Sequence, residues 1–140
     1  MQLGSSGRGR LKLFNQPEGD TGYVVIEGNH PAGEPRIRDH VHGRHEETFL
    51  VVAGVYRMRL GDDVITARAG DYVFVPRGTA HTYCNPGPEL GKIVNIMSPA
   101  EGVEPLVELG ALAGGAVDEG VLTQIHQRHS AVLVDPLPGW

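Results

Sequence analysis

Short apolar stretches with alternating polar positions recur along most of the chain. In the segment 55–60, one aromatic and two aliphatic side chains alternate with Arg57 and Arg59, a period of two that is typical of a strand with one buried face. Turn-forming Gly, Pro, Asp and Asn separate the stretches. We expect strands over residues 11–14, 23–28, 48–54, 55–60, 64–70, 71–76, 81–85 and 92–99. Residues 29–39 contain two prolines and a glycine, so we expect a loop there that runs into an edge strand.

The C-terminal part of the chain has a different pattern. Residues 101–113 carry apolar side chains at near-helical spacing. Asp118 is placed to cap a second helix that runs to residue 129, in which Val121, Leu122 and Ile125 face inward. An extended tail over 132–140 follows.

Composition supports an all-β fold in a single domain. Glycine and proline together make up 30 of the 140 residues, which indicates many turns. We therefore predict a small antiparallel β-barrel over residues 11–99, preceded by a flexible arm over 1–10 and followed by C-terminal helices and a tail over 100–140.

Charge and cysteine content exclude several classes of protein. The net charge of −5 argues against nucleic acid or an anionic membrane as the main partner. The longest run without a polar side chain is eight residues, 49–56, whereas a membrane-spanning helix needs about 20. Cys84 is the single cysteine, so no internal disulfide can form. The basic N-terminus lacks an apolar signal region, which makes a cytoplasmic location the default expectation.

Histidines and one carboxylate mark the candidate site. His40 and His42 are two residues apart, so on a strand they share a face, whereas on a helix they would point about 200° apart. Glu47 is predicted to share a strand face with the apolar Phe49, Val51 and Ala53, where a carboxylate is costly unless it is paired with a cation. His81 begins another strand and shares its face with Tyr83 and Asn85. Alternatively, His40 and His42 lie in a solvent-exposed loop and bind no metal.

These residues form two sequence motifs. The first, H-x-H-x4-E-x6-G, consists of His40, His42, Glu47 and Gly54. The second, G-x5-P-x-G-x2-H-x3-N, consists of Gly70, Pro76, Gly78, His81 and Asn85. Fifteen residues separate the motifs, and the pair resembles the signature of the cupin superfamily. The sequence departs from the family pattern at the leading glycine of the first motif, where Glu34 stands and Gly33 comes one residue early.

The resemblance implies a fold and a metal site. The fold is a barrel of two antiparallel sheets, the jelly roll or double-stranded β-helix. The site is a divalent metal ion held by His40, His42, Glu47 and His81. Three imidazoles and one carboxylate suit Fe, Mn, Ni, Co, Cu or Zn, and the sequence does not distinguish among these ions.

Other polar residues near the motifs have two interpretations each. His45 either supports or joins the ligand set, or it is an exposed turn residue, and Glu46 is expected to face solvent. Tyr83 either lines the cavity as a hydrogen-bond donor or belongs to the core. Arg57 and Arg59 either bind an anionic substrate or lie on a solvated or dimer-facing sheet surface. His126 and His129 are assigned no role.

The resemblance points to an enzyme that acts on an aromatic or polyketide-like small molecule, with Glu47 and Tyr83 as the catalytic candidates. One hypothesis is a quercetin-dioxygenase-like oxygenase, and a second is a non-oxidative, metal-assisted cyclase or isomerase. A third is a small-molecule-binding module without turnover. Exposed strand edges and the resemblance predict a homodimer. The C-terminal helices could close one mouth of the barrel, and the candidate wall residues are Phe49, Val51, Tyr56, Met58 and Phe74.

Overall fold

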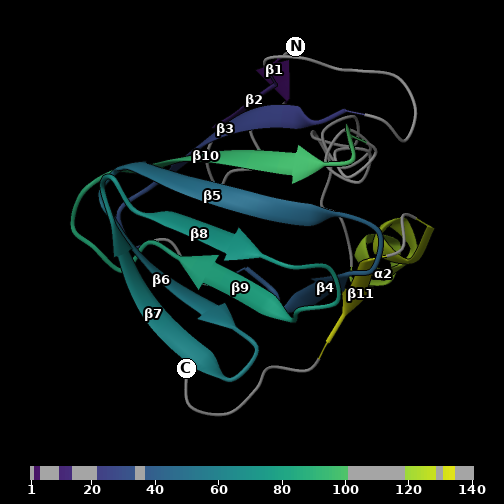
Figure 1. The fold of residues 1–140 in the computed structure, drawn as a ribbon. Helices are drawn as coiled ribbons and strands as arrows, with labels where there is room; N and C mark the ends of the chain where they lie inside the picture. Colours follow the sequence, from purple (N-terminus) through teal and green to yellow (C-terminus); the bar gives the residue numbers. More distant parts are fainter. Residues whose placement is uncertain are drawn as a thin grey trace.

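The chain folds into two antiparallel sheets (Figure 1). The computed structural model describes residues 2–3, 10–13, 22–33, 37–100, 119–128 and 131–134. The six-stranded sheet has the order β1 (Gln2–Leu3), β2 (Arg10–Leu13), β3 (Val24–His30), β10 (Gly91–Ser98), β5 (Glu46–Ala53) and β8 (Tyr72–Val75). The five-stranded sheet has the order β11 (Ala131–Leu133), β4 (His40–His42), β9 (His81–Cys84), β6 (Val55–Leu60) and β7 (Asp63–Arg68). The predicted all-β jelly-roll class is confirmed, although the two sheets do not join into a closed barrel.

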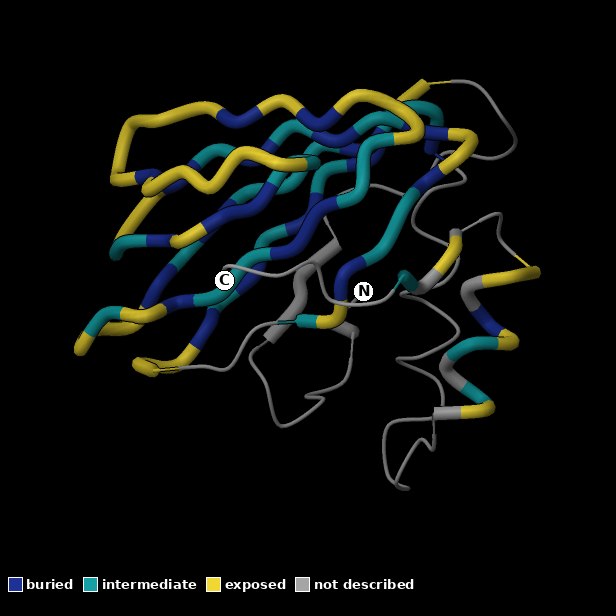
Figure 2. The backbone as a smooth tube through the Cα atoms, turned by 90° about the horizontal axis from the view of Figure 1, so that it is seen from below, coloured by how far each residue is buried: buried dark blue, intermediate teal, exposed yellow. Residues whose placement is uncertain are grey.

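The hydrophobic core lies between the two sheets. Burial alternates along β3 and along most of β5, as expected for strands with one inward face (Figure 2). The six-stranded sheet contributes Phe49, Val51, Val73, Val75 and Ile93 to the core, and the five-stranded sheet contributes Tyr56, Met58 and Ala67. Four of the five predicted wall residues therefore belong to this packed core.

The predicted orientations of Ala53 and Phe74 are wrong, and Arg59 does not lie on a solvated surface. Ala53 is exposed because the β5–β10 register shifts between Lys92 and Ile93, which ends the inward alternation after Val51. Arg59 is only 5% exposed, and its Nε donates a hydrogen bond to the Gly61 carbonyl at 3.0 Å. Phe74 is 58% exposed, because alternation along β8 turns its two valines inward instead.

The motif glycine Gly54 has a structural explanation. It connects β5 to β6 with a φ of 79°, in the left-handed region that disfavours other residues. A Cβ atom at this position would lie 2.8 Å from the Cα of Gly91, so the two backbones could not approach as they do. This glycine therefore allows β5 to reverse tightly into β6, which joins the two sheets.

The C-terminal region agrees with the prediction in part. Helix α2 (Glu119–Arg128) matches the predicted second helix, and its Ile125 is buried. The predicted helix over 101–113 and the cap residue Asp118 lie outside the described residues. Strand β11 was not predicted. It pairs with β4, which carries two of the candidate ligands, so that residues 131–133 border the candidate site.

The N-terminal strands extend the six-stranded sheet. Within the predicted arm over 1–10, Gln2 and Leu3 form β1 and pair with β2, while residues 4–9 lie outside the described part of the chain. The proposed boundaries at residues 10 and 99 stay predictions. Among the residues that the structure describes, no helix combines the length and apolar character needed to cross a membrane.

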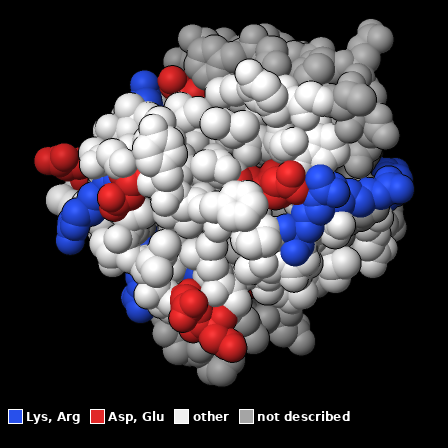
Figure 3. Space-filling model, in the orientation of Figure 1, with Lys and Arg blue, Asp and Glu red and all other residues white. Residues whose placement is uncertain are grey.

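The outer surface carries several large apolar side chains. On edge strand β8, Tyr72 is 71% exposed, and its neighbour Phe74 faces solvent as well. On β7, an edge strand of the five-stranded sheet, Val64 and Ile65 are exposed. On the face shown in Figure 3, acidic and basic groups are scattered, with broad areas of other residues between them.

Candidate metal centre

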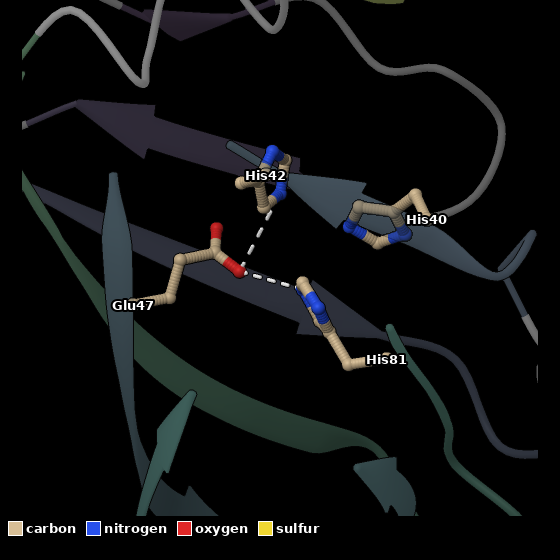
Figure 4. A group of neighbouring side chains, drawn as sticks. All are labelled: His40, His42, Glu47 and His81. Atoms are coloured by element: carbon tan, nitrogen blue, oxygen red, sulfur yellow. Dashed lines mark hydrogen bonds and ion pairs between the residues drawn. The ribbon is translucent and has the colours of Figure 1, made fainter. Parts of the chain in front are cut away.

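The four predicted ligand residues come together at one end of the interior (Figure 4). His40 and His42 lie on β4, and His40 is directly opposite His81 on β9. Glu47 extends toward them from β5 of the other sheet. One donor atom from each residue lies within 4.8 Å of the donor atoms of the other three.

Backbone carbonyls orient two of the imidazole rings. Nδ1 of His40 lies 2.8 Å from the carbonyl oxygen of Arg38, and Nδ1 of His81 lies 2.9 Å from that of Thr79. A carbonyl can only accept, so each Nδ1 carries a proton and donates. Nε2 is then the nitrogen that each ring offers to the cluster, the arrangement usual for histidines that bind metals.

Glu47 is 3% exposed and ionised. Its Oε2 lies 2.9 Å from Nε2 of His81 and 3.7 Å from Nε2 of His42. Burial alone would raise the pKa of Glu47, but the imidazoles of His45 and His81 hold it well below its ordinary value. Burial likewise opposes protonation of His81, yet the carboxylate of Glu47 outweighs it and raises the pKa of His81. The pair therefore shares a proton tightly in the metal-free chain.

His42 is neutral. Burial lowers its pKa to about 2, and the attraction of Glu47 offsets this only in part. Its Nδ1 is buried without a hydrogen-bond partner among the described residues. Buried polar atoms normally have partners, and the neutral imidazole is the form that binds metal ions. The donor set, the ring orientations and this neutral histidine together fit a divalent transition metal.

His45 is buried, so its interpretation as an exposed turn residue is wrong. It is 3% exposed, and its ring centroid lies 4.0 Å from that of His42. Its Nε2 lies 3.9 Å from Oε1 of Glu47, outside the four-residue cluster and beyond hydrogen-bond range. Glu46 is half-buried and forms an ion pair with Arg77 on the surface.

Tyr83 follows His81 by two residues on β9 and packs among other aromatic rings. Its half-buried ring lies 5.4 Å from the ring of Phe49 and 5.3 Å from that of His30. Asn85, two residues further on, holds a loop. Its Nδ2 donates to the carbonyls of His30, Pro31 and Glu89, and its Oδ1 accepts from Gly87 N. The motif asparagine therefore has a structural role.

The sequence analysis missed two inward-facing polar residues, the buried His30 and the half-buried Asn95. His30 was assigned to a loop, but β3 extends to it, and its Nδ1 lies 2.7 Å from the Tyr56 hydroxyl. Burial lowers the pKa of His30 to about 4. Asn95 donates from Nδ2 to Oε1 of Glu47 at 3.1 Å. The sequence pattern could have revealed Asn95, because it is a polar residue between Ile93 and Met97 on the inward row of an apolar strand.

Comparisons with known proteins agree with this geometry. A family model described as a cupin domain matches residues 26–97. The chain is 35% identical over 68 residues to quercetin 2,3-dioxygenase of Bacillus subtilis, covering 49% of this chain and 20% of that protein. It is 34% identical over 61 residues to an uncharacterized protein of Aquifex aeolicus, covering 44% of this chain and 50% of that one. The chain thus spans half or less of the length of these relatives.

A solved structure shares the fold. It is an uncharacterized conserved protein with a double-stranded β-helix domain from Klebsiella pneumoniae, with a TM-score of 0.60 and 26% identity. The match covers 69% of this chain and 81% of that chain. The predicted family resemblance and the predicted double-stranded β-helix are both confirmed.

Proposed function

Because this chain belongs to the cupin domain family, we propose that it is a metal-dependent dioxygenase that acts on an aromatic or polyketide-like small molecule. The observation that carries the proposal is the buried cluster of His40, His42, Glu47 and His81. The identity to quercetin 2,3-dioxygenase over about half of the chain supports the reaction class.

The three histidines and Glu47 would hold the metal ion. Nε2 of His42 and Nε2 of His81 already face the carboxylate, and His42 is neutral, so binding requires the loss of the proton that His81 shares with Glu47. When bound, a redox-active divalent metal supplies a Lewis acid and a site where O₂ and a substrate oxygen can react. Binding should therefore strengthen with pH until His81 is deprotonated.

Glu47 is proposed to act as a proton acceptor as well as a ligand. Its carboxylate is ionised, which is the form that takes up a proton. Because its pKa is low, Glu47 is a weak base, and it accepts protons readily only from acidic hydroxyls. Phenols and enols acidified at the cluster meet this condition, which favours an aromatic or polyketide-like substrate over an ordinary alcohol.

Tyr83 and Phe49 are proposed to position the substrate. Phe49 is the inward residue two positions after Glu47, and its ring lies 6.5 Å from that of His81. Tyr83 is two positions after His81 on β9, and residues so spaced on a strand project on the same side, about 7 Å apart. An aromatic ring bound by its hydroxyl at the cluster would extend toward these two side chains.

The test is oxygen consumption by protein loaded separately with Fe, Mn, Ni, Co, Cu or Zn, with quercetin as the flavonol probe and a polyketide-type phenol beside it. We expect O₂ uptake in step with substrate loss for at least one ion. Conversion without O₂ uptake would instead indicate a cyclase or isomerase, and binding without conversion would indicate a binding module.

Glu47→Gln provides the matched variant, because it keeps the size and one oxygen donor but removes the charge. We expect it to retain part of its metal and to lose turnover by about 10²- to 10⁴-fold, the usual contribution of a general base. Near-normal turnover would show that Glu47 is neither a base nor a required ligand.

A further inference from the structure

The two carboxylate oxygens of Glu47 have different surroundings. Oε2 faces the histidine cluster, 2.9 Å from His81 Nε2. Oε1 points away from it and accepts a hydrogen bond from Asn95 Nδ2 at 3.1 Å. His45 Nε2 lies on this second side as well, 3.9 Å from Oε1. Asn95 therefore holds the oxygen that the cluster does not use.

The position of Asn95 follows from the strand register. On β10, Met97 pairs with Glu47, and Asn95 pairs with Phe49 on β5. Asn95 is thus the diagonal neighbour of Glu47 on the inward face, within reach of its side chain. The residues before and after Asn95 on this face, Ile93 and Met97, are apolar and buried.

A polar side chain at this position needs an explanation. The Oδ1 atom of Asn95 is buried without a hydrogen-bond partner among the described residues, and leaving such an atom unpaired is unfavourable. Turning the amide over would place Oδ1 against the Oε1 atom of Glu47 and lose the hydrogen bond. An aliphatic residue would leave no unpaired Oδ1 and no oxygen facing Glu47. The hydrogen bond to Glu47 is therefore what the amide of Asn95 provides.

We propose that Asn95 is a positioning residue that fixes the carboxylate of Glu47, so that Oε2 alone is presented to a metal bound among the three histidines. The inference rests on the proposed metal site. Because the hydrogen bond from Asn95 holds Oε1 on the side away from the cluster, the carboxylate does not rotate to offer both oxygens. Its other oxygen, Oε2, stays directed at the histidine nitrogens. Asn95 thereby determines how Glu47 binds the metal, without touching the metal itself.

The test uses Co²⁺ alone as the probe, because its visible absorption reports the number and arrangement of ligands. Asn95→Leu removes the donor and keeps the branching at Cγ. Met97→Leu is the matched control, since it lies on the same inward face of β10 and no polar contact is lost. Both variants are also made in a Glu47→Ala background, and the Co²⁺ dissociation constant and absorption spectrum of each protein are measured.

We expect Asn95→Leu to weaken Co²⁺ binding by about 10- to 100-fold, as is typical when a residue supporting a metal ligand is removed, and to change the spectrum. In the Glu47→Ala background the same substitution should change binding by less than about threefold, because Asn95 acts on the metal through Glu47 and its effect is lost with that carboxylate. Met97→Leu should leave binding nearly unchanged in both backgrounds.

Two results would overturn the inference while leaving the metal site intact. One is an equal loss of affinity from Asn95→Leu in both backgrounds, which would mark a general packing role. The other is an unchanged dissociation constant and spectrum. If the native chain itself fails to bind Co²⁺ or any other divalent ion, the metal site is refuted, and the role of Asn95 is refuted with it.

Discussion

His30 should make the metal-free protein lose stability in acid. Its buried imidazole has a pKa of about 4, against an ordinary value of 6.5. Between these pH values the unfolded chain binds a proton that the folded chain does not, so the free energy of unfolding falls as the pH falls. Because the pKa of His30 is lowered from 6.5 to about 4, the free energy of unfolding should fall by about 3 kcal/mol between pH 7 and pH 4 from this residue alone.

The assay is urea unfolding of metal-stripped protein at pH 7 and pH 4, followed by circular dichroism. His30→Gln removes the titrating group, and the other six histidines remain in both proteins and cancel in the comparison. We expect the drop in unfolding free energy between the two pH values to be about 3 kcal/mol smaller in His30→Gln.

Tyr56→Phe serves as the control. It removes the hydroxyl that lies 2.7 Å from His30 Nδ1 but keeps the imidazole buried. Since burial is the cause of the lowered pKa, this variant should keep the full acid sensitivity. If His30→Gln loses as much stability in acid as the native chain, the reasoning about His30 is refuted.

Two further predictions concern metal content and assembly. Protein purified without a polyhistidine tag should hold about one divalent ion per chain by elemental analysis. His42→Ala should lose most of this metal, because a neutral donor on a paired strand is removed. Equal metal content in both proteins would place the ion elsewhere. The chain should be a dimer by light scattering, and a monomeric native chain would contradict this prediction. If the apolar face of the exposed edge strand β8 is the contact, Phe74→Glu should shift the protein toward the 15.0 kDa monomer.

The four-residue cluster could be predicted from the sequence because its two motifs resemble the cupin signature, whereas strand periodicity alone predicts only which residues share a face. His40 and His42 share a face by their spacing, and alternation from Glu47 through Phe49 to Val51 fixes the inward row of β5. Ala53 breaks that row because the bulge in the β5–β10 pairing depends on the partner strand. No local pattern in either strand reveals such a shift.

Contacts between distant segments account for the other differences. The pairing of β11 with β4 joins residues about ninety positions apart, and three apolar residues at 131–133 give no indication of their partner. His30 was assigned to a loop because the nearby Pro31 and Gly33 suggested an early end to the strand. In the structure, Asn85 binds the carbonyls of His30 and Pro31, and this long-range contact holds the end of β3.

The hydrophobic core determines where the donor atoms of the candidate site lie. Glu47 comes from one sheet and the three histidines from the other, so their separation is set by how the sheets pack and not by the local chain. Phe49 and Val51, the next inward residues after Glu47, pack in the same cluster as Met58, whose strand pairs with the one that carries His81. A change of volume in this core should therefore shift the carboxylate relative to the imidazoles, even though no core residue is a ligand. The hydrogen bond from Asn95 refines this placement, because packing can locate the backbone of β5 but cannot choose between the two oxygens of a carboxylate.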